Sequence, residues 1–294
     1  MTEIAFVTYA AGPEPTASDQ LAVAALRDRG VTVTAVPWNN PSADWPAFDA
    51  VVVRSTWDYW AHPDAFPAWI DARGQDGTAL WNPAPLLRWN LDKRYLRDLE
   101  AEGVPIVPTA WMEPGQSLRG ILAERGWTRA VVKPRVSGGG FDTWTCDAHP
   151  TAEQEAEAAR LAASPRGAMV QPFVPEIADP GEWSLVFLGG RFSHAVLKRP
   201  CEGEFRVQEQ RGGSSQPAIA PRTLVDAAAR VLEHVRHPWL YARVDGCVVD
   251  GTLLLMELEM LEPSLFLEQH AAAPQRFADA ILAVAARSEA VFTR

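Results

Sequence analysis

Two glutamates near the end of the sequence are the residues whose types and spacing suggest chemistry most directly. Glu257 and Glu259 lie two residues apart in an otherwise apolar run, so the alternation of a β-strand puts both carboxylates on one face, together with Leu253 and Leu255. Two carboxylates on a half-buried face require a cation between them, and Mg²⁺ is a good candidate because it prefers oxygen ligands. An ion pair with Arg243 on an exposed sheet face is the alternative, and the hairpin alone favours neither.

The two glutamates belong to a predicted β-hairpin whose turn contains Asp250-Gly251, a pair typical of tight hairpin turns. A two-residue turn would point Asp245 to the face opposite Glu257. We predict instead a three-residue loop with the glycine in the left-handed conformation, which places residue 243 opposite Glu257. In that register Asp245 joins the carboxylate face as a third metal ligand.

Two lysines lie where an anion would stabilise them. Lys133 ends the apolar run of residues 130–133, where an unpaired ammonium would be costly, so it requires an anionic partner. The glycine-rich loop of residues 137–140 follows, and its backbone N–H groups can approach phosphate oxygens. Lys93 is predicted in the first turn of a helix that begins at Asn90, where the helix dipole favours an anion; a solvent-facing lysine is the alternative.

A second basic segment contains Lys198, Arg199, Arg206 and Arg211 within fourteen residues of an acidic protein. This concentration of cations predicts a clamp for an anionic ligand. The alternative is a solvated loop whose charge is offset by the glutamates between these residues.

The first eighty residues alternate strand, helix and strand patterns, which predicts a parallel, Rossmann-like sheet. The segment lacks the G-x-G-x-x-G turn of dinucleotide sites. Arg54-Ser55-Thr56-Trp57-Asp58 directly follows the third strand, at the sheet edge where such folds bind ligands. Arg54 could therefore bind a substrate carboxylate and Asp58 a substrate amine, unless the loop is simply held by its own aromatic side chains.

Composition narrows the class of partner. The chain has 294 residues, a net charge of -10 and a pI near 5.1, which argues against nucleic-acid binding and favours a small-molecule partner. Its three cysteines show no disulfide or zinc-site spacing. There is no signal-peptide pattern and no apolar run of membrane-spanning length. We therefore expect a soluble, cytoplasmic protein without a membrane partner; the oligomeric state, with a homodimer as one candidate, stays open.

Taken in order, these features resemble the ATP-grasp superfamily over essentially the whole chain. The resemblance implies an α/β (α+β) ATP-grasp fold with ATP and Mg²⁺ as cofactors. It also implies a Rossmann-like substrate domain over residues 1–88, a small subdomain with the glycine-rich loop over 89–168, and a C-terminal subdomain with the metal site over 169–294.

The resemblance assigns expected roles to individual residues. The phosphates are expected to contact Lys93, Lys133 and the loop residues Ser137, Gly138, Gly139 and Gly140, and adenine and ribose are expected to contact Gln171, Phe173, Val174 and Glu182. The cations expected to bind the transferred phosphoryl group are Arg199, Arg206 and Arg211, and Arg243 is a further catalytic candidate. The expected metal ligands are Asp245, Glu257 and Glu259. The family's usual E-x-N motif has an asparagine where this chain has Glu259, so the number of bound metal ions stays open.

The expected activity is that of a carbon–nitrogen ligase, in which ATP converts a substrate carboxylate to an acyl phosphate that an amine attacks. The chain looks most like the small ATP-grasp cyclo-ligases of antibiotic biosynthesis that close O-ureido-D-serine to D-cycloserine. Arg54, Ser55, Asp58 and Ser264 are the expected substrate contacts. An intermolecular amino acid or dipeptide ligase and a non-catalytic nucleotide-binding module are the alternatives.

Overall fold

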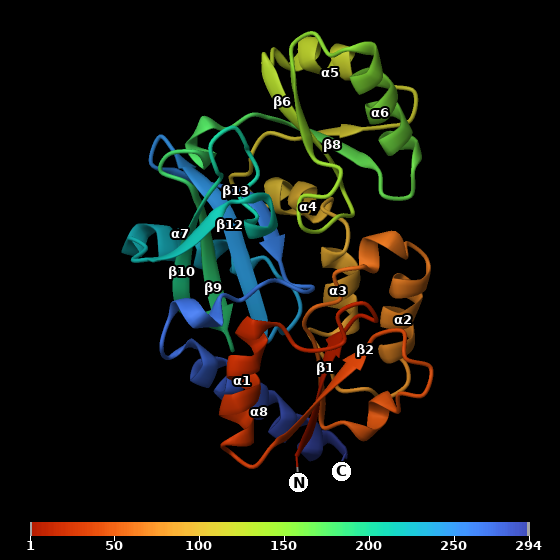
Figure 1. Ribbon diagram of the computed structural model, residues 1–294, viewed down its shortest axis with the longest axis vertical. Helices are drawn as coiled ribbons and strands as arrows, with labels where there is room; N and C mark the ends of the chain where they lie inside the picture. The colour runs from red at the N-terminus through yellow and green to blue at the C-terminus, as the bar shows by residue number, and fades with distance from the viewer. Residues whose placement is uncertain (1, 293–294) are drawn as a thin grey trace.

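The computed structural model describes residues 2–292, with side chains except at 209 and 287–292. Three sheets form three lobes, and the two chain ends lie near one another at the base of the molecule (Figure 1). None of the described helices combines the length and apolar character needed to cross a bilayer.

The N-terminal lobe is the predicted parallel sheet, with strand order β2-β1-β3-β4. Thr16 caps its first helix by accepting a hydrogen bond from the Asp19 backbone N–H. The lobe consists of β1 (Glu3–Thr8), α1 (Ala17–Arg27), β2 (Thr32–Pro37), β3 (Ala50–Val53), α2 (Ala65–Arg73) and β4 (Leu80–Trp81). The prediction of a β-α-β parallel sheet is therefore confirmed.

The second lobe is an antiparallel sheet of order β5-β8-β6-β7 that packs against α5 and α6 (Figure 1). Thr151 and Gln154 form the capping box that starts α6. Two helices lead into this lobe, which comprises α3 (Ala84–Asn90), α4 (Tyr95–Ala101), β5 (Ala110–Met112), α5 (Leu118–Arg125), β6 (Arg129–Pro134), β7 (Trp144–Asp147), α6 (Ala152–Ala163) and β8 (Ala168–Pro172).

The third lobe is an antiparallel sheet of order β11-β10-β9-β12-β13. The final helix leaves it and packs beside α1 in a core shared with the N-terminal sheet. The elements are β9 (Glu182–Leu188), β10 (Arg191–Arg199), β11 (Ser214–Ala218), α7 (Arg222–Glu233), β12 (Tyr241–Val249), β13 (Thr252–Glu259) and α8 (Ala273–Phe292).

The predicted domain ranges stay a prediction, although two elements cross them. The boundary at 168/169 falls inside β8, which pairs with β5 and β6, and α8, which belongs to the third predicted range, packs against the first lobe as well as the third. Sheet pairing and helix docking depend on long-range contacts, so local sequence patterns do not locate these boundaries.

Two buried asparagines, one just before α3 and one at its end, bind the chain to the third lobe. The Asn82 side chain donates to the carbonyls of Tyr241 and Met260 at 2.9 and 2.8 Å and accepts from the Leu240 N–H. Asn90, which we predicted to cap the helix of Lys93, instead bonds Leu258 and Met260. Because buried backbone groups must be paired, these amides hold the chain around the hairpin in place.

Candidate active site

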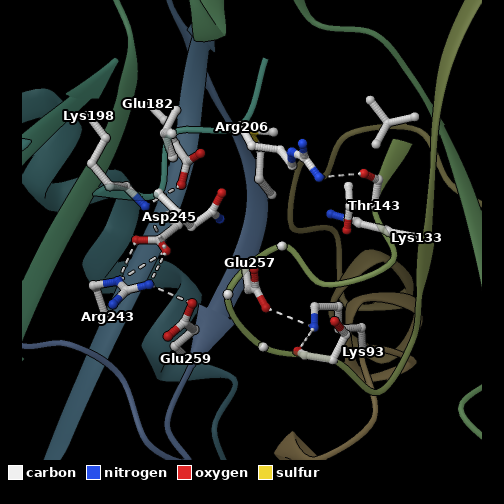
Figure 2. A pocket seen from close by; sticks show the side chains of 18 of the residues that line it. Lys93, Lys133, Thr143, Glu182, Lys198, Arg206, Arg243, Asp245, Glu257 and Glu259 are labelled. Carbon is white, nitrogen blue, oxygen red and sulfur yellow. Dashed lines mark hydrogen bonds and ion pairs between the residues drawn. The ribbon is translucent and has the colours of Figure 1, made fainter. Parts of the chain in front are cut away.

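A cavity of about 590 Å³ opens between the two antiparallel sheets and brings most of the predicted site residues together (Figure 2). The predicted residues in its walls are Lys93, Lys133, Ser137, Gly138, Gly139, Gly140, Gln171, Phe173, Val174, Glu182, Arg206, Arg211, Arg243, Asp245, Glu257, Glu259 and Ser264. Of the residues predicted for the site, Arg54, Ser55, Asp58 and Arg199 do not line it.

The hairpin register differs from the one predicted. Val249 pairs with Thr252, so the turn has two residues, and both Asp250 and Gly251 have positive φ. The irregularity lies further along, where the pairing skips Met256. The prediction of a three-residue loop with a bulge at Gly251 is therefore wrong.

The bulge at Met256 decides which side chains share a face. It brings Asp245 directly opposite Glu257, so the two carboxylates do lie on one face. Leu253 and Leu255 pack instead in the core cluster on the other side of the sheet, and their predicted place beside the glutamates is wrong. Gly246 permits the close approach here, because a Cβ would lie 2.4 Å from the Leu254 carbonyl oxygen.

All three lysines of the chain line the cavity. Lys93 lies in the turn between α3 and α4, not in a first helical turn, and its Nζ contacts the Ser137 carbonyl at 2.8 Å and Glu257 Oε1 at 3.0 Å. Lys133 is the next-to-last residue of β6, and its ammonium group makes no hydrogen bond or ion pair with any described residue. Burial lowers the pKa of Lys133, and Glu257 offsets this only in part.

The glycine-rich loop lies between these lysines and the N-terminal lobe. Gly139 and Gly140 have φ of 60° and 66°, a region that favours glycine. The Tyr59 hydroxyl donates to the Ser137 carbonyl at 3.0 Å, and Phe141 stacks on Trp60. The loop is thus closed against the segment that follows β3.

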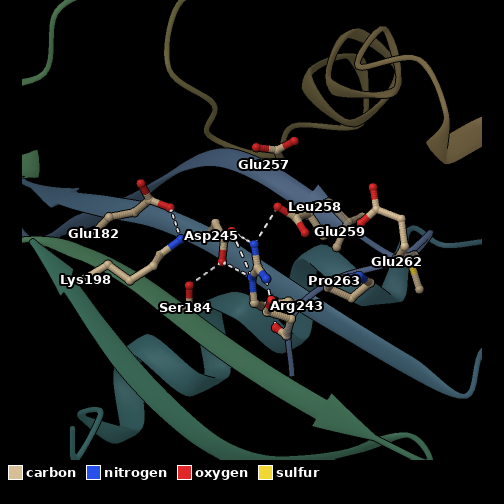
Figure 3. A network of polar contacts seen from close by, with 12 residues as sticks. Glu182, Ser184, Lys198, Arg243, Asp245, Glu257, Leu258, Glu259, Glu262 and Pro263 are labelled. Carbon is tan, nitrogen blue, oxygen red and sulfur yellow. Dashed lines mark hydrogen bonds and ion pairs between the residues drawn. The ribbon is translucent and has the colours of Figure 1, made fainter. Parts of the chain in front are cut away.

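Four buried charges form a network along the floor of the cavity (Figure 3). Asp245 accepts from Ser184 at 2.6 Å, from Arg243 at 2.8 Å and from Lys198 at 3.4 Å, and Lys198 also pairs with Glu182 at 2.6 Å. Burial raises the pKa of Asp245, but the charges of Arg243 and Lys198 outweigh it and leave the value at about 2. Both oxygens of Asp245 are therefore engaged by protein groups.

The two glutamates also have cationic partners. Glu257 pairs with Lys93, and Glu259 contacts Arg243 at 2.5 Å, so the ion pair with Arg243 considered for both glutamates exists for one of them. Within residues 2–292, apart from the undescribed side chains, no three His, Cys, Asp or Glu groups are placed to hold a metal ion by themselves. The metal-ligand roles stay predictions.

The residues predicted to contact adenine and ribose line the cavity. Gln171 donates its side-chain amide to Thr109 Oγ1 at 2.9 Å, while Phe173 and Val174 follow at the exit of β8. Glu182 faces the cavity from β9, already paired with Lys198. Their roles toward a nucleotide stay predictions.

The basic segment is divided by strand alternation. Arg206 donates to Glu204 and to the Thr143 carbonyl, and Arg211 reaches the Gly140 carbonyl at 3.3 Å. Arg199 is exposed and donates to the Pro180 carbonyl. Since neighbouring side chains on a strand point to opposite faces, Lys198 enters the cavity and Arg199 turns away, so Arg199 is wrongly predicted.

The predicted substrate contacts after β3 are structural instead. Arg54 is 1% exposed, pairs with Asp19 at 2.9 Å and donates to the Pro263 carbonyl. Ser55 is buried. Asp58 accepts from the Trp38 indole and lies 3.5 Å from His62. These three predictions are wrong because the loop turns its polar groups into the lobe, whereas Ser264 does line the cavity.

We expect Arg54→Met to lower the free energy of unfolding by about 3–5 kcal/mol, because it leaves the buried Asp19 carboxylate without its cation. ATP affinity should stay unchanged. Urea unfolding and ATP titration measure the two quantities, and the double variant Asp19→Asn/Arg54→Met should lose less than the sum of the single variants. Unchanged stability with a raised KM for the carboxylate substrate would restore the role first predicted.

Sequence reasoning gave no role to Tyr59 or Glu262, which both line the cavity, and it placed Lys198 in the basic clamp without a role of its own. The scarcity of lysine was a usable signal for Lys198, since a chain with three lysines places each of them at this site. Burial raises the Tyr59 pKa well above its usual value, so its hydroxyl remains a donor. Glu262 had no local signal, because its surroundings come from distant segments.

Comparison with known proteins identifies the family. Residues 4–82 match the family described as D-cycloserine synthetase DcsG, N-terminal domain. The chain is 34% identical over 272 residues to the Cycloserine biosynthesis protein DcsG of Streptomyces lavendulae, covering 87% of this chain and 90% of that protein.

Solved structures agree with this match. The crystal structure of D-cycloserine synthetase DcsG superimposes with a TM-score of 0.86 at 32% identity, covering 97% of this chain and 99% of that one. The RimK domain protein ATP-grasp from Sphaerobacter thermophilus has a TM-score of 0.69 at 17% identity, covering 96% and 100%, and shares the fold. The chain therefore belongs to the DcsG family and shares its fold with an ATP-grasp protein.

Proposed function

We propose that this protein is an ATP-dependent ligase that activates a substrate carboxylate and closes a C–N bond within the same molecule, converting O-ureido-D-serine to D-cycloserine. The observation that carries the ATP-dependent step is Lys133, a cation without a partner among the described residues, facing Glu257 beneath a glycine-rich loop. The specific product is supported by the 34% identity to a cycloserine biosynthesis protein.

The cavity's cations suit a triphosphate and a transferring phosphoryl group. Lys93, Lys133 and the N–H groups of the loop would hold the phosphates. Arg206 and Arg211 would neutralise the transferred group. Arg243, oriented by Asp245, would stabilise negative charge on the carbonyl oxygen under attack.

The residues present fit Mg²⁺. This ion commonly takes one or two carboxylates together with substrate phosphates rather than an all-protein cage, so Glu257 and Glu259 suffice as its protein ligands. With Asp245 held by Ser184 and two cations, we assign that carboxylate to positioning Arg243. When bound, Mg²⁺ would supply charge neutralisation on the phosphates.

The proposed reaction has two bond-forming steps. A carboxylate oxygen of the substrate takes the γ-phosphoryl group, which gives an acyl phosphate and ADP. The nitrogen bound to the side-chain oxygen of the same molecule then attacks the acyl carbon, so that the ring C–N bond forms and phosphate leaves. Hydrolysis then removes the carbamoyl group from that nitrogen. The adenine end would lie against Gln171, Phe173 and Val174, with ribose near Glu182.

A screen for ADP release over small amino acids and O-substituted serines, with products identified by mass, tests the proposal. O-ureido-D-serine should give ADP and D-cycloserine in equal amounts. A product that incorporates a second amine would instead identify an intermolecular ligase. A stable phosphorylated product would identify a phosphotransferase, and tight Mg-ATP binding without any turnover would identify a binding module.

A further inference from the structure

Glu262 differs from the other carboxylates that face the cavity. It is 8% exposed, and its carboxylate makes no hydrogen bond or ion pair with any residue that the structure describes (Figure 3). The four others each have a cation as partner: Glu182 with Lys198, Asp245 with Arg243, Glu257 with Lys93, and Glu259 with Arg243. An unpaired carboxylate among paired ones requires an explanation.

The backbone around Glu262 is held firmly. Its carbonyl accepts from the Trp57 indole at 3.2 Å, and the next carbonyl, of Pro263, accepts from Arg54 at 2.8 Å. A Cβ on Gly138 would lie 3.7 Å from Glu262 Oε1. The backbone is therefore fixed, and the carboxylate lies beside the glycine-rich loop, near Trp57 and Tyr59 of the N-terminal lobe.

The protein's own cations are already engaged nearby. Arg243 donates to Asp245, to Glu259 and to the Ser264 carbonyl, and Lys93 to Ser137 and Glu257. Burial raises the pKa of Glu262 to about 7, which these cations oppose only in part. A buried carboxylate is costly until a cation pairs with it, and the open side of Glu262 is the cavity.

We infer that Glu262 binds the α-ammonium group of the amino-acid substrate and so selects amino acids over acids that lack the amine. This inference rests on the proposed function. An ammonium at this position would form a charge-assisted hydrogen bond in a largely dehydrated site. It would also orient the substrate, with its carboxylate turned toward the cations that surround the phosphoryl group.

The test compares two substrates in Glu262→Gln and wild type: O-ureido-D-serine, and 3-(ureidooxy)propanoic acid, which lacks the α-amine. Losing one partner of a buried charge pair weakens binding strongly, so kcat/KM for ADP release with the amino substrate should fall about 100-fold, mainly through KM. With the des-amino acid the two proteins should agree within about 3-fold, because no ammonium is present.

Controls separate this role from a structural one. Glu268→Gln makes the same change at an exposed site in the same segment and should match wild type. Glu262→Asp keeps the charge and should recover part of the loss. ATP affinity should be unaltered in all variants, and neither Glu262→Gln nor Glu268→Gln should melt below wild type, because neither change leaves a cation without its partner. Glu262→Met replaces the glutamine variant if that protein does not fold.

The outcomes are distinct. Equal losses with both substrates, or no loss with the amino substrate, would overturn the role of Glu262. ADP release without D-cycloserine would overturn the proposed function while the comparison of substrates still tests Glu262. Absence of ADP release from wild type with O-ureido-D-serine would overturn both.

Discussion

Glu257→Gln should reduce ADP release by a factor of about 1,000 or more, the loss expected when charge stabilisation of a transferring phosphoryl group is removed. Burial raises the pKa of Glu257, but Lys93 and Lys133 outweigh it and keep the carboxylate charged. The amide would remove one of the two proposed Mg²⁺ ligands and leave Lys93 without its ion-pair partner. Coupled measurement of ADP formation at saturating ATP checks the result.

The matched control is Glu233→Gln, an exposed residue on α7, which should retain wild-type activity. Circular dichroism and melting temperature establish whether the Glu257 variant is folded. Unaltered ADP formation in a folded Glu257→Gln protein would remove Glu257 from the site chemistry.

Lys133→Met should weaken ATP binding about 10- to 100-fold, as expected for the loss of a hydrogen bond to a charged phosphate. The fold should be preserved, because the Lys133 ammonium has no partner among the described residues and Glu257 keeps its ion pair with Lys93. Removing the cation also relieves its repulsion with Lys93. Calorimetric titration with a non-hydrolysable ATP analogue measures the affinity.

Without nucleotide, the melting temperature of Lys133→Met should equal that of wild type, and the stabilisation by added nucleotide should be smaller. Arg222→Met, at a position exposed on α7, is the control for loss of a cation. Equal nucleotide affinity in Lys133→Met and wild type would refute the role given to Lys133.

Local patterns in the sequence predicted the helices and strands. They also predicted most of the site residues that line the cavity. Alternation and turn residues predicted the parallel first sheet and the carboxylate hairpin. These predictions succeed because strand alternation and turn residues act on neighbours close in sequence.

Long-range contacts decided the rest. Arg54 became a structural residue because Asp19 and the Pro263 carbonyl, far from it in sequence, lie against it. Asn90 was predicted to begin a helix, but its side chain instead forms hydrogen bonds with the backbone of Leu258 in β13 and of Met260 just after it. The sequence of a short polar segment shows which groups can donate or accept hydrogen bonds, but it does not show which partners lie beside them in the folded protein.

The carboxylate hairpin shows the same division. The sequence alone determined that Glu257, Glu259 and an Asp-Gly turn occur in one hairpin, and hence that carboxylates gather there. The tertiary structure decided the register through a bulge at Met256. It also paired Asp245 with Arg243 and Lys198, and it left the Glu262 carboxylate without an ion-pair partner among the described residues. The physical reason is that a bulge and an ion pair depend on which strand or lobe packs alongside, and that choice is made by the whole chain.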